Sequence, residues 1–103
     1  MKMNTCDAMD LETATRRAET LKALGHPIRL RIVDSLIAGP RAVGELAEML
    51  NQQSAIISQQ LKILRMSGLV AVDKHDGRSF YHLANLHLPR LFDCLRSCDQ
   101  QED

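Results

Sequence analysis

The stretch SAIISQQLKILRMSGLV, residues 54–70, and the AVDKHDGRSFYHL that follows it, residues 71–83, decide the fold of this chain. In the first part, Ile57, Leu61 and Leu64 recur at the spacing of one buried helix face, which predicts a helix from about Ser54 to Ser67. In the second part, the pattern changes to two short strands around Asp76-Gly77, a dipeptide typical of tight hairpin turns. The two parts together predict a helix followed directly by a β-hairpin.

Capping residues, helix breakers and apolar spacing predict four more helices. They cover about residues 11–24 behind an Asp10 cap, residues 27–38 from Pro27, residues 43–50 and residues 85–98. The short third and fourth helices are joined by the polar link Asn51-Gln52-Gln53. The chain is therefore predicted to be mainly α with a small β-hairpin, a winged helix-turn-helix of order α-α-α-α-β-β-α. We expect one domain over residues 1–103, with flexible acidic ends at about residues 1–9 and 99–103.

Composition sets limits on the class of protein. Of the 103 residues, 45% are hydrophobic and only 3% are aromatic, so the core is aliphatic and thin, which favours an oligomer. The formal net charge is zero, yet residues 13–96 hold twelve Lys or Arg against seven acids, a basic body that suits nucleic acid. No apolar run is long enough to span a membrane and the amino end lacks a signal-peptide core, so we expect a cytoplasmic protein with no membrane partner.

The sequence contains no pattern typical of an enzyme. It has no glycine-rich phosphate loop, no nucleophile elbow and no paired carboxylates at catalytic spacing. We therefore predict that the protein is not an enzyme and has no catalytic residues.

The helix over residues 54–67 and the hairpin carry side chains suited to DNA. A helix in the major groove needs short polar side chains for base edges and cations for phosphates. The first kind is supplied by Ser54, Ser58, Gln59 and Gln60, and the second by Lys62 and Arg65. In the hairpin, Lys74, His75 and Arg78 flank the turn and are predicted to contact phosphates or the minor groove. The alternative is that both are ordinary solvated polar surfaces.

Three segments together give the chain a family resemblance. LKALGHPIRLRIVDSL (21–36), VGELAEMLNQQSAIISQQLKILRMSGLV (43–70) and KHDGRSFYHL (74–83) resemble the ArsR/SmtB family of bacterial repressors. The resemblance implies a homodimer that binds a double-stranded DNA operator and releases it when an inducer occupies a sensor site. Gln53 stands where the family often has a capping Ser, and Ala55 replaces a polar residue common in the family. Both positions are still carried over as DNA-contacting, with the operator sequence left open.

The resemblance also implies a dimer interface built from the first and last helices. Both helices carry apolar residues at the spacing of a packed seam. The expected interface residues are Leu11, Ala14, Ala18, Leu21, Leu88, Leu91, Leu95 and Cys98.

The cysteines are the candidate sensor. In a helix, Cys94 and Cys98 lie one turn apart on the same side, and Cys6 near the amino end could supply a third thiol. Two or three thiolates suit trivalent arsenic or antimony, or a soft divalent metal, acting as inducer, with no resident cofactor required. Oxidants or reactive sulfur are the alternative: Cys98 falls where persulfide-sensing relatives carry one thiol, and Asp34 stands where they carry the other. The third interpretation is that the cysteines are inert packing residues.

A zinc site of the kind found in relatives is less well supported. The matching positions are Asn85, His87, Cys98 and Gln101, of which Asn and Gln are poor zinc ligands. His87 therefore remains only a weak alternative metal ligand. Two further hypotheses stay open for the whole chain: a ligand-independent DNA-binding regulator, and a protein-interaction module that has lost DNA binding.

Overall fold

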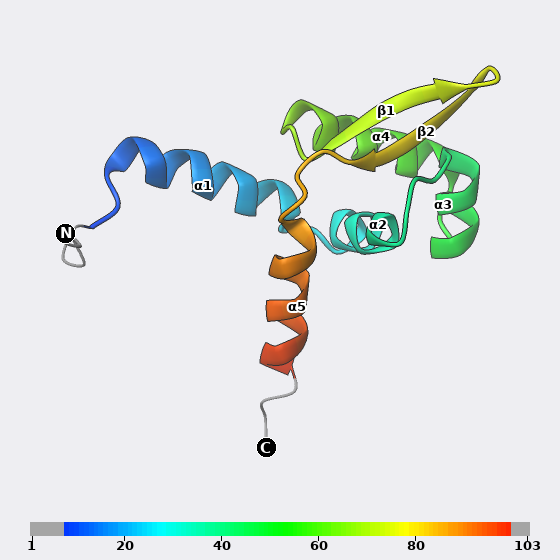
Figure 1. The fold of residues 1–103 in the computed structure, drawn as a ribbon. Coiled ribbons are helices and arrows are strands. Elements are labelled where there is room, and N and C mark those ends of the chain that lie inside the picture. Colours follow the sequence, from blue (N-terminus) through cyan, green and yellow to red (C-terminus); the bar gives the residue numbers. More distant parts are fainter. Residues whose placement is uncertain (1–7, 100–103) are drawn as a thin grey trace.

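The computed structural model describes residues 8–99. Along the chain the elements are α1 (Leu11–Leu24), α2 (Pro27–Ile37), α3 (Val43–Leu50), α4 (Ser54–Met66), β1 (Val70–His75), β2 (Arg78–Leu83) and α5 (Leu88–Asp99). In Figure 1, α2, α3, α4 and the hairpin form one body, from which α1 and α5 project in different directions. This is the predicted winged helix-turn-helix order. Within residues 8–99, no helix is long and apolar enough to cross a membrane.

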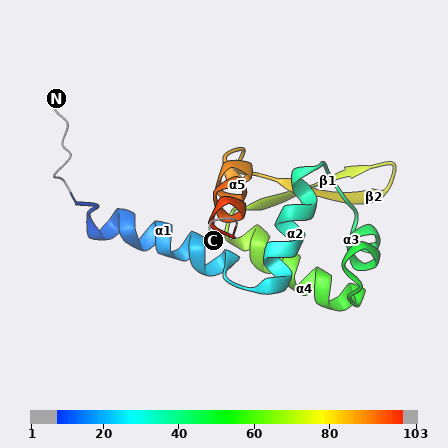
Figure 2. The same cartoon turned by 90° about the horizontal axis from the view of Figure 1, so that it is seen from below.

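Helix α1 begins and ends where its sequence predicts. The Asp10 carboxylate accepts a hydrogen bond from the Thr13 amide at 3.1 Å and caps the helix, and Thr13 lowers the pKa of that carboxyl through side-chain and backbone hydrogen bonds. Gly25 follows the last turn. Only Ala23 and Leu24, at the carboxyl end of α1, are buried, so the rest of the helix extends beyond the body, as Figure 2 also shows.

Helix α2 starts with an imidazole cap. His26 has extended backbone geometry, and its Nδ1 accepts a hydrogen bond from the Ile28 amide at 3.1 Å, while Pro27 occupies the first turn, where no amide donor is needed. His26 is thus a structural residue at the junction of α1 and α2.

The turn between α3 and α4 is fixed by its backbone and by one long side chain. Asn51 adopts the left-handed conformation, with φ at 54° and ψ at 51°, which ends α3 in a sharp change of direction. The Arg31 guanidinium donates to the Leu50 carbonyl oxygen at 3.3 Å and so ties α2 to the last turn of α3. The helix before the turn is therefore tied to α2 by a side-chain hydrogen bond.

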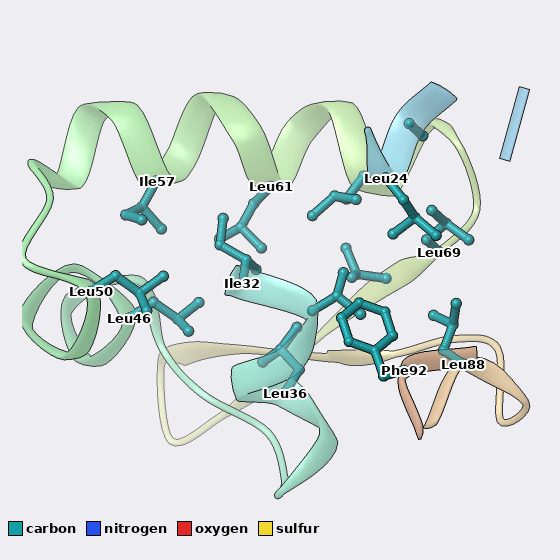
Figure 3. Packing of buried hydrophobic residues seen from close by; sticks show 14 residues of the cluster. Leu24, Ile32, Leu36, Leu46, Leu50, Ile57, Leu61, Leu69, Leu88 and Phe92 are labelled. Atoms are coloured by element: carbon teal, nitrogen blue, oxygen red, sulfur yellow. The ribbon is translucent and has the colours of Figure 1, made fainter. Parts of the chain in front are cut away.

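The core lies between α2, α3, α4 and the base of the hairpin (Figure 3). It is almost wholly aliphatic, as the composition predicts, with Phe92 from α5 as its one buried aromatic side chain among the described residues. The large side chains with full or nearly full burial are Ile32, Val33, Leu46, Ile57, Leu61 and Leu64. Since three of these belong to α4, the buried face of α4 sets the orientation of its opposite face.

The hairpin forms the wing. Strands β1 and β2 pair antiparallel from Val70 opposite Leu83 to His75 opposite Arg78. Asp76 and Gly77 form the turn with φ values of 53° and 78°. Glycine adopts such a positive φ without steric cost, and Asp tolerates it better than most residues. A bridge from Arg41 extends this sheet: its amide donates to the Tyr81 carbonyl at 3.0 Å, and the Tyr81 amide donates back at 2.8 Å. The bridge fixes the wing to the segment that precedes α3.

The prediction that the last helix begins near Asn85 was wrong: α5 begins at Leu88. The Asn85 side chain accepts a hydrogen bond from the His87 amide at 2.8 Å, and this local turn replaces the first turn of the expected helix. At the other end, Asp99 belongs to α5 rather than to a flexible end. The remaining end residues, 1–7 and 100–103, lie outside the described part of the chain.

Removing the imidazole cap is expected to destabilise the fold by a measurable amount. His26→Ala leaves the Ile28 amide without its side-chain acceptor and should lower the free energy of unfolding by about 1 kcal/mol. His26→Asn keeps a side-chain acceptor and should lower it much less. Urea unfolding of both variants at one fixed protomer concentration makes the comparison. Equal stability of the alanine variant and the unsubstituted protein would show that the cap contributes nothing.

Candidate nucleic-acid interface

Helix α4 presents one continuous polar face to solvent. Ile57, Leu61 and Leu64 point into the core, and the residues on the other side of the helix are exposed. Of the side chains predicted to contact DNA, the exposed ones on α4 are Ser54, Ala55, Ser58, Gln59, Lys62 and Arg65. This face thus combines short polar groups near the start of the helix with two cations further along it.

The start of α4 leaves its first amides uncapped by a side chain. Gln53 is the N-cap residue, and its side chain makes no capping hydrogen bond. Its carbonyl accepts from the Ile56 and Ile57 amides at 3.0 and 3.1 Å, which leaves the Ser54 and Ala55 amides at the exposed end of the helix. Amides at a helix start, together with the helix dipole, attract phosphate. The replacement of the usual capping Ser therefore suits a phosphate contact by the backbone.

Gln60 lies at the edge of this face, and its contact with a base stays a prediction. Its side chain is half-buried, and Oε1 is buried with no hydrogen-bond partner among residues 8–99. A two-bond contact to adenine needs both the oxygen and the nitrogen of the amide. Gln59, one residue earlier, is exposed and retains both groups for such a contact.

The wing presents its cations near the turn. Lys74, His75 and Arg78 are all exposed, as predicted. The Arg78 guanidinium carbon lies 5.0 Å from the centre of the Phe80 ring, a cation–π contact that restricts this side chain. Further down the hairpin, His82 Nε2 lies 3.0 Å from Asp73 Oδ2 across the two strands. The wing tip therefore carries the cations Lys74 and Arg78 against the one carboxylate of Asp76, while the hairpin further from the tip holds a histidine–carboxylate pair.

Two arginines support the interface, and sequence reasoning did not single them out. Arg31 holds the turn before α4 through the Leu50 carbonyl, and Arg41 holds the wing through its backbone pairing with Tyr81. Neither function has a local sequence signal, because each depends on a partner distant in the chain.

The first and last helices carry apolar side chains that the protomer does not bury. On α1, Leu11 and Leu21 are 82% and 59% exposed, and Ala18 is exposed as well. On α5, Leu95 and Cys98 are exposed and Leu91 is half-buried. The radius of gyration is 16.1 Å, against about 13 Å for a compact chain of this length. The protomer is therefore extended because α1 and α5 project from it.

Leu88 does not belong to this exposed set. Its side chain is 3% exposed and packs in the core of its own protomer with Phe92, so it has no surface left to offer a partner. Its assignment to the dimer interface was wrong. The apolar residues of α5 therefore belong to two surfaces: Leu88 and Phe92, near its start, face the core of the protomer, and Leu95 is exposed.

Cys94 and Cys98 are free and exposed on α5. They lie on the side of the helix opposite Arg96, which donates to Asp34 of α2 at 3.2 Å and to Asp93 at 2.7 Å. Asp34 is thus engaged in an ion pair with α5. Cys6 and Gln101 lie outside the described residues, and the part of the chain from residue 8 to residue 99 contains no cluster of three metal-ligating side chains. His87 is exposed in the link before α5 and is not grouped with other ligands there.

Comparison with known proteins identifies the family of this chain. The family model described as bacterial regulatory protein, arsR family, matches residues 26–72. The chain is 34% identical to the biofilm growth-associated repressor of Xylella fastidiosa, over 99% of this chain and 95% of that protein. It is 38% identical to the regulator NmtR of Mycobacterium tuberculosis, over 82% and 71% of the two chains. A homodimeric winged helix-turn-helix domain from Mycobacterium bovis superposes with a TM-score of 0.78 at 29% identity, covering 91% of this chain and 89% of that one. The chain therefore belongs to the ArsR family of bacterial winged helix-turn-helix regulators.

Proposed function

We propose that this protein is a homodimeric transcriptional repressor that binds a DNA operator through α4 and the wing. The observation that carries the proposal is the exposed face of α4: it holds Ser58, Gln59, Lys62 and Arg65, follows a helix-turn and precedes a basic hairpin tip. In a major groove, the polar side chains near the start of α4 suit base edges, and the cations further along it suit the phosphates beside the groove.

The exposed apolar faces of α1 and α5 support the homodimer. An apolar helix face gains stability only when it is buried, and the described protomer leaves this one open. A second copy offers the same two faces, which makes a two-fold symmetric interface self-complementary. The homodimeric M. bovis domain has the same fold. Two copies of α4 then bind two half-sites of one operator.

Release from DNA is proposed to depend on thiol chemistry at Cys94 and Cys98, with Cys6 as a third ligand. Both thiols of the pair are exposed on one side of α5, and Cys98 adjoins Leu91 and Leu95 of the proposed interface. Trivalent arsenic or antimony, or a soft divalent metal, binds two or three thiolates. A ligand held there adds bulk and charge beside the dimer contact, which changes how the two α4 helices are spaced.

Neutral substitutions on α4 are expected to weaken DNA binding in a salt-dependent way. Lys62→Gln removes one phosphate contact from each protomer, so the slope of log K against log salt should become shallower by about 2 for the dimer. Arg65→Gln should act similarly. Arg90→Gln removes the same charge from an exposed position on α5 and is the control. A filter-binding titration at several salt concentrations measures the slopes. Unchanged slopes in both α4 variants would contradict the proposal and favour an interaction module.

A carboxylate within the seam is expected to separate the protomers. Leu21→Asp places a charge on an exposed part of α1, so the protomer should fold while the dimer dissociates. Leu91→Asp should also dissociate the dimer, but Leu91 is half-buried against the core, so this variant is expected to lose protomer stability as well. Met49→Asp introduces the same carboxylate at an exposed apolar position of α3, outside the proposed interface, and is the control. Sedimentation velocity distinguishes 11.6 kDa protomers from dimers. A Leu21→Asp protein that remains a dimer would show that the interface lies elsewhere.

Arsenite is expected to release the reduced, metal-free protein from DNA upstream of its own gene. The Cys94→Ser/Cys98→Ser variant should bind DNA equally well and ignore arsenite, and Cys6→Ser tests the third ligand. Fluorescence anisotropy of labelled DNA follows release. If arsenite leaves the complex intact, the soft-metalloid proposal fails. Release by an inorganic polysulfide would then identify a persulfide response, and no release by either would identify inert cysteines.

A further inference from the structure

A groove of about 590 Å³ opens between α1, the start of α2 and the end of α4. Its apolar part is formed by Ala23, Ile63 and Met66, and hydroxyl groups of Thr20 and Ser67 lie at its edge. Met66 is 78% exposed. The volume lies within the usual range of about 300–1,000 Å³ for small-molecule sites.

The groove is lined by more positive than negative charge. Arg16, Lys22 and Arg29 contribute cations and Glu19 the one carboxylate. Within residues 8–99, none of these four forms an ion pair at 4.0 Å or less. Arg29 Nε is buried and has no hydrogen-bond partner in the described part of the chain. A guanidinium stays protonated at all ordinary pH values, so Arg29 keeps its positive charge beside the groove.

The groove lies away from the proposed dimer interface. On α1, Arg16, Thr20 and Ala23 occupy the side of the helix opposite to Ala14, Ala18 and Leu21 of the seam, as the helical repeat of 3.6 residues requires, whereas Lys22 lies beside the seam. A second copy packed on the seam therefore leaves this side of α1 open.

From this arrangement we infer that the groove binds an amphipathic organic anion, a carboxylate or phosphate on an apolar body. The acidic head pairs with Arg16 and Arg29, and the apolar body covers Ile63 and Met66. Carboxylates and phosphates both accept paired hydrogen bonds from a guanidinium. Because α1, α2 and α4 all line the groove, a ligand there contacts the helix of the dimer seam and the helix that faces DNA at once. Any difference in its affinity between free and DNA-bound protein couples the two equilibria.

An NMR titration of the full-length dimer, without DNA, tests this inference separately from the repressor function. Decanoate is the probe, and decan-1-ol has the same chain length without the charge. We expect decanoate to saturate and to shift the amide signals of Thr20 and Ser67, which flank the groove, while decan-1-ol binds at least about tenfold more weakly. Decyl phosphate, titrated in the same way, distinguishes the two kinds of head group.

Matched variants then assign the head group's partners. Arg16→Gln changes an exposed side chain and should weaken decanoate binding about tenfold without affecting the fold, and Arg29→Gln should act likewise. Arg90→Gln removes a cation outside the groove and should leave the affinity unchanged. Saturable shifts lost in Arg16→Gln but kept in Arg90→Gln would support the site. Equal binding of acid and alcohol, unchanged affinity in Arg16→Gln, or shifts confined to other residues would each overturn it.

Discussion

The structure depends on the burial of one aliphatic face of α4 against α2 and α3. Ile57, Leu61 and Leu64 are fully buried against Ile32 and Leu46, and this contact is the centre of the core. Once that face is fixed, the opposite face must point outward, since the helical repeat leaves no other arrangement. The hydrophobic contact therefore determines which side chains α4 offers to DNA. The hydrogen bond from Arg31 to the Leu50 carbonyl holds the turn before α4, and the backbone bridge between Arg41 and Tyr81 holds the wing.

A core of this size leaves much of the chain without a place to pack. Only the end of α1 contributes to it, through Ala23 and Leu24, and α5 contributes mainly Leu88 and Phe92. On these helices Leu11, Leu21 and Leu95 stay exposed in the protomer and Leu91 is half-buried, and this is the surface that the proposed second copy covers. In the proposed homodimer, Cys98 lies beside the contact between the two copies. Chemistry at Cys98 would then act next to the surface that sets the spacing of the two α4 helices.

Local signals predicted most of the fold. Caps and breakers such as Asp10, Gly25 and the Asp76-Gly77 turn act within a few residues, so the bounds of α1 and α3 and the hairpin turn follow from the sequence. The start of α5 was missed because the Asn85 side chain forms a competing local turn. Periodicity alone could not separate Leu88, which faces its own core, from Leu95, which does not. Both residues satisfy the same spacing.

The candidate site was predicted less completely than the fold. Helical spacing correctly placed the exposed residues of α4 on one face, namely Ser58, Gln59, Lys62 and Arg65. Spacing alone could not show that the side chain of Gln60, at the edge of the buried stripe, is half-buried with its oxygen in the interior. The Arg41 bridge to Tyr81 and the groove between α1 and α4 join segments far apart in the chain. No local pattern encodes such contacts, because they arise only when the helices pack.

In the proposed complex, two copies of α4 bind one operator together. Selection of DNA from a random pool by the reduced, full-length protein tests it without assuming a target. We expect enrichment of a two-fold symmetric sequence whose half-sites are separated by about 10 base pairs or a multiple of that, one helical turn of DNA. Enrichment of a single half-site without symmetry, or no enrichment at all, would contradict it.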